Sequence, residues 1–152
     1  MRTAWRIVQW ERHADAFSGE GAALCGGRWN SPGTRVVYLS EHKSLAALET
    51  LVHLPRSATA RFAFIRAEFP EDAVELLPPA GWPSNWAHEP PQADSQAVGD
   101  AWVRENRAAV LAVPSAIIPE ELNYLLNPAH PHFKKIAIGK PVPFAFDPRL
   151  LT

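Results

Sequence analysis

The spacing of apolar side chains along the chain predicts many short strands and two helices. Strands are expected over residues 5–10, 35–39, 62–69, 73–77, 109–118, 135–138 and 142–146, with 73–77 at a sheet edge. Helices are expected over residues 44–53 and 95–107, where apolar residues recur on one helical face. Because strands outnumber helices in a mixed order, we predict one α+β domain over residues 1–152, with a mixed, largely antiparallel sheet.

Two segments lack any periodic pattern. Residues 19–33 contain five of the eight glycines, which predicts a loop whose backbone can approach a ligand closely. Residues 78–91 contain five prolines and two tryptophans, and irregular segments of this length are usually functional or form interaction surfaces. Trp82 and Trp86 have no periodic core role, so we expect them at an exposed interface.

Glu49 is the polar residue that fits the hydrophobic pattern least well. Ser40 is a candidate cap for the helix over 44–53, and Pro55 is expected to end it. The apolar stripe of this helix consists of Leu45, Leu48 and Val52, with Glu49 in the remaining position. An isolated carboxylate of this kind more often reaches water from the margin of a stripe, or pairs with an arginine. The alternative is a functional carboxylate.

Three further polar side chains interrupt elements that otherwise look apolar: Arg28, Tyr38 and Ser115. Arg28 follows two glycines, where a guanidinium can hold a phosphate or ribose oxygen, although a surface arginine after a turn looks the same. Tyr38 is compatible with a core position in which its hydroxyl bonds a neighbouring carbonyl. Ser115 splits the apolar run over 110–118 and is equally compatible with a bulge.

Composition narrows the class of protein. The chain has 152 residues, 47% of them apolar, which is enough for one core. A net charge of −1 argues against direct nucleic-acid binding through general electrostatics. Cys25 is alone, so no intrachain disulfide forms, and it has no activating partner in the sequence. No signal peptide or membrane-spanning run is present, so we expect a cytoplasmic protein that does not bind membranes.

The histidines and two asparagines are weaker candidates for function. His130 and His132 lack the ligand spacing of a metal site, so no metal is expected. His53 follows Glu49 by one helical turn and is a candidate for lining the same site. Asn123 and Asn127 are compatible with satisfying loop backbone rather than a ligand.

Taken in order, these residues resemble the RES domain, a family of bacterial toxins named for an arginine, a glutamate and a serine. The resemblance covers essentially the whole chain, through Gly27-Arg28-Trp29-Asn30, Tyr38, Glu49, Ser115 and the stretch over 123–131. It implies an enzyme that acts on NAD⁺ as its substrate, with no further cofactor, and a fold similar to that of ADP-ribosyltransferases. It also implies an antitoxin partner with an Xre-like helix-turn-helix part.

The chemistry of NAD⁺ cleavage then suggests a role for each residue. Breaking the nicotinamide–ribose bond creates an oxocarbenium-like centre that a nearby carboxylate can stabilise. The expected catalytic set is Arg28, Tyr38, Glu49 and Ser115. Glu49 would stabilise the developing charge and be kept ionised by Arg28 or another cation. Arg28 would bind the pyrophosphate or a ribose hydroxyl, Tyr38 would stack on nicotinamide or position its ribose, and Ser115 would hydrogen-bond the amide or ribose.

The acceptor and the partner surface remain open at this point. Asn30 and His53 complete the expected substrate-binding set. Water or phosphate as acceptor makes the protein an NAD⁺ glycohydrolase or phosphorylase, whereas a protein acceptor makes it an ADP-ribosyltransferase. A non-catalytic nucleotide-binding module is the third alternative. We expect the antitoxin to dock near residues 19–33 and 78–91 and to block access to Arg28, and we expect the free protein to self-associate.

Overall fold

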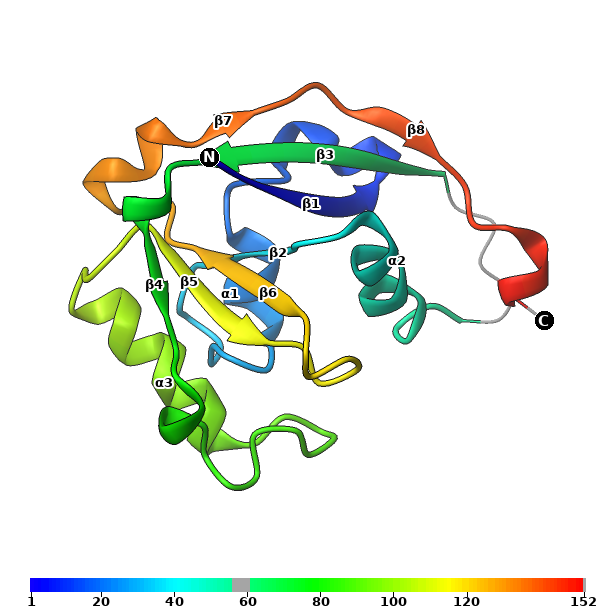
Figure 1. The fold of residues 1–152 in the computed structure, drawn as a ribbon. Helices are drawn as coiled ribbons and strands as arrows, with labels where there is room; N and C mark the ends of the chain where they lie inside the picture. The colour runs from blue at the N-terminus through cyan, green and yellow to red at the C-terminus, as the bar shows by residue number, and fades with distance from the viewer. Residues whose placement is uncertain (56–60, 152) are drawn as a thin grey trace.

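The computed structural model describes residues 1–55 and 61–151 and confirms the α+β class (Figure 1). Within these residues, eight strands form one sheet in the order β4-β5-β6-β2-β1-β3-β7, and β8 also pairs with β3. The strands are β1 (Arg2–Gln9), β2 (Val37–Ser40), β3 (Phe62–Phe69), β4 (Val74–Leu76), β5 (Val110–Pro114), β6 (Leu122–Leu126), β7 (Ala137–Ile138) and β8 (Val142–Phe144). Only the pairing of β4 with β5 is parallel among them, so the sheet is mixed and largely antiparallel.

Among the described residues, three α-helices pack against this sheet. They are α1 (Glu20–Cys25), α2 (Lys43–Leu51) and α3 (Ala93–Arg104). Short 3₁₀ segments cover Trp10–Asp15, Glu71–Ala73, Pro79–Gly81, Pro131–Lys135 and Pro148–Leu151. In Figure 1, α3 lies along β4 and β5. Helix α2 follows β2 in the chain and contacts both β1 and β2. None of the helices in the described part of the chain is long and apolar enough to cross a membrane.

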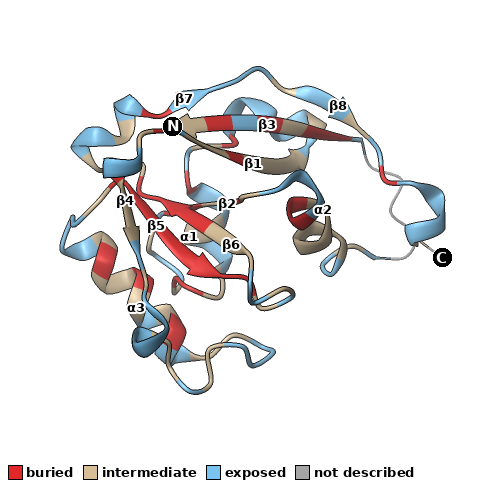
Figure 2. Cartoon of the chain, in the orientation of Figure 1, coloured by how far each residue is buried: buried red, intermediate tan, exposed pale blue. Residues whose placement is uncertain are grey.

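Strand β5 is the centre of the core because both of its faces are buried (Figure 2). Val110 and Ala112 belong to one apolar cluster, which extends to Phe69 of β3. Leu111 and Val113 belong to the other, in which Trp102 of α3 is fully buried. Successive side chains of a strand point to opposite faces, so an unbroken apolar run is the pattern expected for a doubly covered strand.

The predicted loop over residues 19–33 contains a helix that the sequence analysis missed. Helix α1 begins after Gly19 and ends before Gly26, and both glycines have a positive φ (78° and 73°). Such a φ is easily adopted only by glycine, so each glycine turns the backbone where the helix starts or stops. The residues between them include good helix formers, but the glycine content of the segment obscured this signal.

Other differences concern the boundaries of predicted elements. The predicted strand over 109–118 ends at Pro114, the chain turns, and β6 returns over residues that had been assigned to no element. Helix α2 is capped by His42 rather than Ser40, whose hydroxyl instead donates to Asn123 in β6. The side chain of Val52, predicted to be buried, is 61% exposed because the helix ends at Leu51.

The segment over residues 78–91 is tied to the core by its tryptophans, which corrects the expectation that they have no core role. Trp86 stacks on the buried Trp29 with ring centroids 6.1 Å apart. Trp82 lies 5.2 Å from Trp86, and its indole N–H donates to the carbonyl of Leu77 at 3.3 Å. Aromatic packing of this kind fixes an irregular segment without regular secondary structure.

The contact between α3 and the glycine-rich segment predicts that Gly99→Ala is strongly destabilising. A Cβ at Gly99 would overlap the backbone carbonyl of Trp29, which cannot move without disturbing the core. We expect a loss of about 1–3 kcal/mol in the free energy of unfolding, measured by urea denaturation. Gly21→Ala in α1 is the matched control, because nothing lies within 4 Å of its added Cβ. Equal stability of the two variants would contradict the packing described here.

Candidate active site

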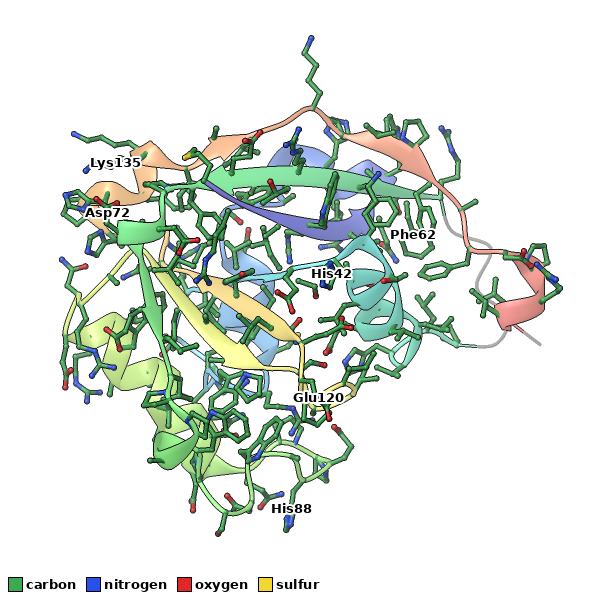
Figure 3. The ribbon with its side chains drawn as sticks, viewed as in Figure 1. His42, Phe62, Asp72, His88, Glu120 and Lys135 are labelled. Carbon is green, nitrogen blue, oxygen red and sulfur yellow. The ribbon has the colours of Figure 1, made fainter. Side chains whose placement is uncertain are left out.

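A cleft of about 1020 Å³ lies among β1, α1, β2, α2 and residues 87–91. Four of the sequence-predicted site residues line it: Arg28, Tyr38, Glu49 and His53. The other two, Ser115 and Asn30, are fully buried and do not reach its wall. In Figure 3 the label His42 marks the start of α2, and Phe62, which also lines the cleft, marks the start of β3.

The Glu49 carboxylate is held by two neutral donors. The Ser115 hydroxyl donates to its Oε1 at 2.7 Å, and the Asn123 side-chain amide donates to the same oxygen at 2.9 Å. The expectation that Arg28 or another cation pairs with Glu49 is wrong for the described residues, in which the carboxylate bonds only this hydroxyl and this amide. A carboxylate oxygen that accepts two hydrogen bonds keeps one defined position.

Ser115 and Asn123 are themselves fixed by the turn between β5 and β6. The backbone N–H groups of Ile117 and Ile118 each donate to the Ser115 hydroxyl at 3.1 Å. Asn123 faces Ser40 in the register of β2 with β6, and the Ser40 hydroxyl donates to its amide oxygen at 2.7 Å. Thus the interruption of the apolar run at Ser115 reflects a turn that serves the carboxylate.

Arg28 holds the segment over residues 82–91 against the glycine-rich loop. Its Nη1 donates to the carbonyls of Trp86 at 2.9 Å and His88 at 2.7 Å, and its Nη2 donates to the Glu89 carboxylate at 2.8 Å. His88 is labelled on this segment in Figure 3. A guanidinium has more N–H donors than these contacts use, so Arg28 can still present donors to the cleft that it lines.

The Tyr38 hydroxyl organises the backbone around Arg28. It donates to the Asn30 side-chain oxygen at 2.7 Å and accepts the N–H of Trp29 at 3.0 Å. Burial raises the pKa of Tyr38, so the phenol keeps its proton at neutral pH. The Asn30 amide donates to the carbonyls of Ala22 and Thr34, at 2.9 and 3.0 Å. Asn30 therefore braces the loop from inside, and Tyr38 lines the cleft.

Arg6 is a cleft-lining cation that the sequence analysis did not single out. Its Nε donates to the carbonyl of Ala16 at 2.6 Å and its Nη1 to that of Tyr38 at 3.0 Å. No carboxylate pairs with it among the described residues, and burial lowers its pKa to about 10, which leaves it charged at pH 7. The available signal was its position in the middle of a predicted strand, where a cation needs a partner.

One cluster in the described residues has the chemistry of metal ligands. Possible ligand atoms of Glu41, His42 and Glu121 lie within 4.8 Å of one another. Glu41 already accepts the backbone N–H of Leu122 at 2.8 Å, and its carboxylate lies 3.8 Å from the His42 imidazole. None of the three residues lines the cleft.

The role of the Tyr38 hydroxyl predicts that Tyr38→Phe destabilises the protein. The change leaves the N–H of Trp29 and the side-chain oxygen of Asn30 without the hydroxyl that they bond, and a buried unsatisfied polar group costs about 1–3 kcal/mol. We expect a loss of this size in urea denaturation. The control is Tyr124→Phe, because the buried Tyr124 hydroxyl has only a 3.4 Å contact with Arg2. If Tyr38→Phe is no less stable than Tyr124→Phe, the loop does not depend on this hydroxyl.

Comparison with known proteins supports the assignment of a family. The RES domain profile matches residues 3–147. A Yersinia enterocolitica protein named Toxin Res is 40% identical over 148 residues, which cover 96% of this chain and 97% of that protein. A Sphingobium protein named Prs ADP-ribosylating toxin is 39% identical over 153 residues, covering 97% and 95% of the two chains.

The fold comparison agrees with the sequence comparison. A chain in the crystal structure of the M. tuberculosis MbcT–MbcA toxin–antitoxin complex superposes with a TM-score of 0.74 at 22% identity. The superposition covers 99% of this chain and 86% of that one, so the two share the whole fold. Together, the profile match and the full-length relatives show that this chain belongs to the RES domain family.

Proposed function

We propose that this protein is a toxin that binds NAD⁺ in the cleft and cleaves its nicotinamide–ribose bond. The observation that carries the proposal is a carboxylate, Glu49, held by Ser115 and Asn123 in the wall of a cleft of about 1020 Å³. Full-length relatives named as toxins, one of them as an ADP-ribosylating toxin, support it. The expected consequence in the cell is loss of NAD⁺.

The reaction needs few groups from the protein. Nicotinamide leaves with the electron pair of the glycosidic bond, and C1″ of the ribose becomes oxocarbenium-like. Oε1 of Glu49 is occupied by two hydrogen bonds, so Oε2 is the oxygen available to face that positive charge. Water or inorganic phosphate then adds to C1″, and the proton it loses goes to solvent. Nicotinamide is neutral on leaving and requires no general acid.

Arg6 and Arg28 are the cations proposed to bind the diphosphate. Both line the cleft, and Arg6 has only carbonyl partners, so an anion would compensate for its burial. Arg28 is partly neutralised by Glu89 and contributes its remaining donors. Tyr38 supplies an aromatic surface for nicotinamide or its ribose, and His53, exposed at the end of α2, lies on the same wall.

A second candidate reaction is transfer of ADP-ribose to a protein. The name of the Sphingobium relative, Prs ADP-ribosylating toxin, is the observation that favours it. Both reactions use the same donor site, because the acceptor enters only after nicotinamide has begun to leave. They differ in products, since transfer leaves a modified protein and little free ADP-ribose.

We also propose that an antitoxin with an Xre-like helix-turn-helix part neutralises this protein. The structural neighbour in a toxin–antitoxin complex supports an antitoxin partner. The loops over residues 19–33 and 78–91 are the proposed docking site, because Leu24 in α1 is 72% exposed and Glu89, which lines the cleft, is also exposed. Occupation of this surface would block entry of NAD⁺.

The assay for the proposed function is incubation with NAD⁺, with and without inorganic phosphate, followed by chromatography of the products. We expect nicotinamide together with ADP-ribose or its phosphorylated form. Glu49→Gln should lower the rate by about 10²–10³, because it removes the charge that stabilises the transition state. Glu105→Gln is the control, since this exposed residue pairs with Arg107 outside the cleft. Circular dichroism checks that both variants are folded.

Four outcomes of these experiments would contradict the proposal or favour the second candidate reaction. Wild-type protein that releases no nicotinamide, or a folded Glu49→Gln variant that is fully active, contradicts the proposal. Nicotinamide release that requires a protein acceptor favours ADP-ribosylation. In cells, expression should lower NAD⁺ before viability falls, whereas growth arrest at undiminished NAD⁺ also favours modification of a protein target.

The proposed role of Arg6 predicts that replacing it weakens the binding of NAD⁺. Burial lowers the pKa of Arg6 to about 10, so its charge is a cost to folding that is fully present below pH 10. Arg6→Gln removes that cost together with the hydrogen bonds to the carbonyls of Ala16 and Tyr38, and it weakens attraction for the diphosphate. We expect KM for NAD⁺ to rise by about tenfold or more without an electrostatic loss of stability.

The control for Arg6→Gln is Arg104→Gln, because Arg104 is exposed at the end of α3 and lies outside the cleft. This variant should keep the wild-type KM. Raising the salt concentration should also raise the KM of the wild-type protein more than that of Arg6→Gln. A wild-type KM in Arg6→Gln would show that the diphosphate does not use this cation.

A further inference from the structure

The side-chain amide of Asn123 is fixed at both ends. Its Nδ2 donates to Glu49 Oε1 at 2.9 Å, and its Oδ1 accepts the Ser40 hydroxyl at 2.7 Å. The direction of the amide follows from chemistry, because an ionised carboxylate only accepts hydrogen bonds and the NH₂ group must face it. Ser40 is buried in β2, directly opposite Asn123 in the register of β2 with β6. The orientation of Asn123 is therefore set by the sheet.

The two donors to Glu49 come from different strands and converge on one oxygen. Ser115 follows β5 and Asn123 lies in β6, and both donate to Oε1. A glutamate carboxylate has a broad terminal torsion, so one hydrogen bond would leave it free to turn. A second donor from another direction restricts that rotation. The hydrogen bonds in the described residues leave Oε2 as the oxygen that can face the cleft.

We propose that Asn123 is a positioning residue, oriented by Ser40, that aims the free oxygen of Glu49 at the reacting carbon. This inference rests on the proposed function and extends it from the catalytic carboxylate to the group that orients it. The sequence is compatible with an Asn123 that only satisfies loop backbone. In the described residues, however, its side chain bonds Ser40 and Glu49 and no backbone group.

A positioning role predicts an effect on kcat rather than on KM. Asn123 bonds the carboxylate, whereas the cations proposed to bind the diphosphate are Arg6 and Arg28. Misplacing a catalytic group slightly is enough to lower the rate by about 10²-fold. Direct binding of substrate by Asn123, which also lines the cleft, would instead raise KM.

The test compares Asn123→Ala with Asn127→Ala. Both remove a side-chain amide from the β6 region, but within the part of the chain that the structure describes the Asn127 side chain bonds only the backbone N–H of Ala129, at 3.0 Å. We expect Asn123→Ala to lower kcat by about 10–100-fold with KM within about threefold of wild type. Asn127→Ala should keep the wild-type kcat when the rate is divided by the concentration of folded protein. That concentration is measured by active-site titration with NAD⁺. Ser40→Ala should shift kcat in the same direction by a smaller factor, and it tests the idea if Asn123→Ala does not fold.

A double-mutant cycle with Glu49→Gln shows whether Asn123 acts through the carboxylate. If it does, adding Asn123→Ala to Glu49→Gln should lower the residual rate by less than about twofold, because the oxygen to be positioned no longer carries the charge. Full additivity of the two changes would overturn the inference, as would an unchanged kcat in both Asn123→Ala and Ser40→Ala. Wild-type protein that does not consume NAD⁺ would overturn the proposed function, and this inference with it.

Discussion

The constraint on which the cleft depends is the partial burial of a carboxylate that pairs with no cation among residues 1–55 and 61–151. Glu49 is tolerated there because Ser115 and Asn123 donate to one of its oxygens at 2.7 and 2.9 Å. Hydrogen bonds from neutral donors offset desolvation without neutralising the charge. A salt bridge would have neutralised part of the charge of this carboxylate. The carboxylate would then stabilise the positively charged transition state of the proposed reaction less well. The turn after β5 holds Ser115, and the pairing of β2 with β6 orients Asn123, so that both donors meet the carboxylate.

The glycine-rich loop and the proline-rich segment form one structure on the other side of the cleft. Arg28 joins them through two carbonyls and the Glu89 carboxylate, and Trp86 stacks on Trp29 beneath. The Tyr38 hydroxyl then fixes the loop to β2. A residue that appeared in the sequence only as an anion-binding candidate therefore also builds the wall on which the anion would lie. Arg6, across the cleft, carries the charge without a structural counter-ion in the described residues.

Local signals were sufficient where one element decides the outcome. The doubly apolar run of β5 and the amphipathic pattern of α3 predicted their elements, and the mixed order of strands predicted the class. They were insufficient where the chain reverses. Strand β6 was missed because Asn123 and Asn127 resemble loop residues, and α1 was missed because glycines surround it. In both cases the element is stabilised by contacts with segments that are distant in the sequence: β6 pairs with β2 and β5, and α1 packs against the core.

The sequence by itself singled out the side chains for which we propose catalytic and binding roles: Arg28, Tyr38, Glu49 and Ser115 each stood out as polar groups in apolar surroundings. Only the tertiary structure decided what each one touches. Glu49 accepts a hydrogen bond from Ser115, 66 residues further along the chain, because the register of β5, β6 and β2 brings neutral donors to it. Periodicity in the sequence indicates which face of an element a residue occupies, whereas its hydrogen-bond partners depend on which strands pair. Strand pairing in turn depends on the apolar surface buried by the whole core.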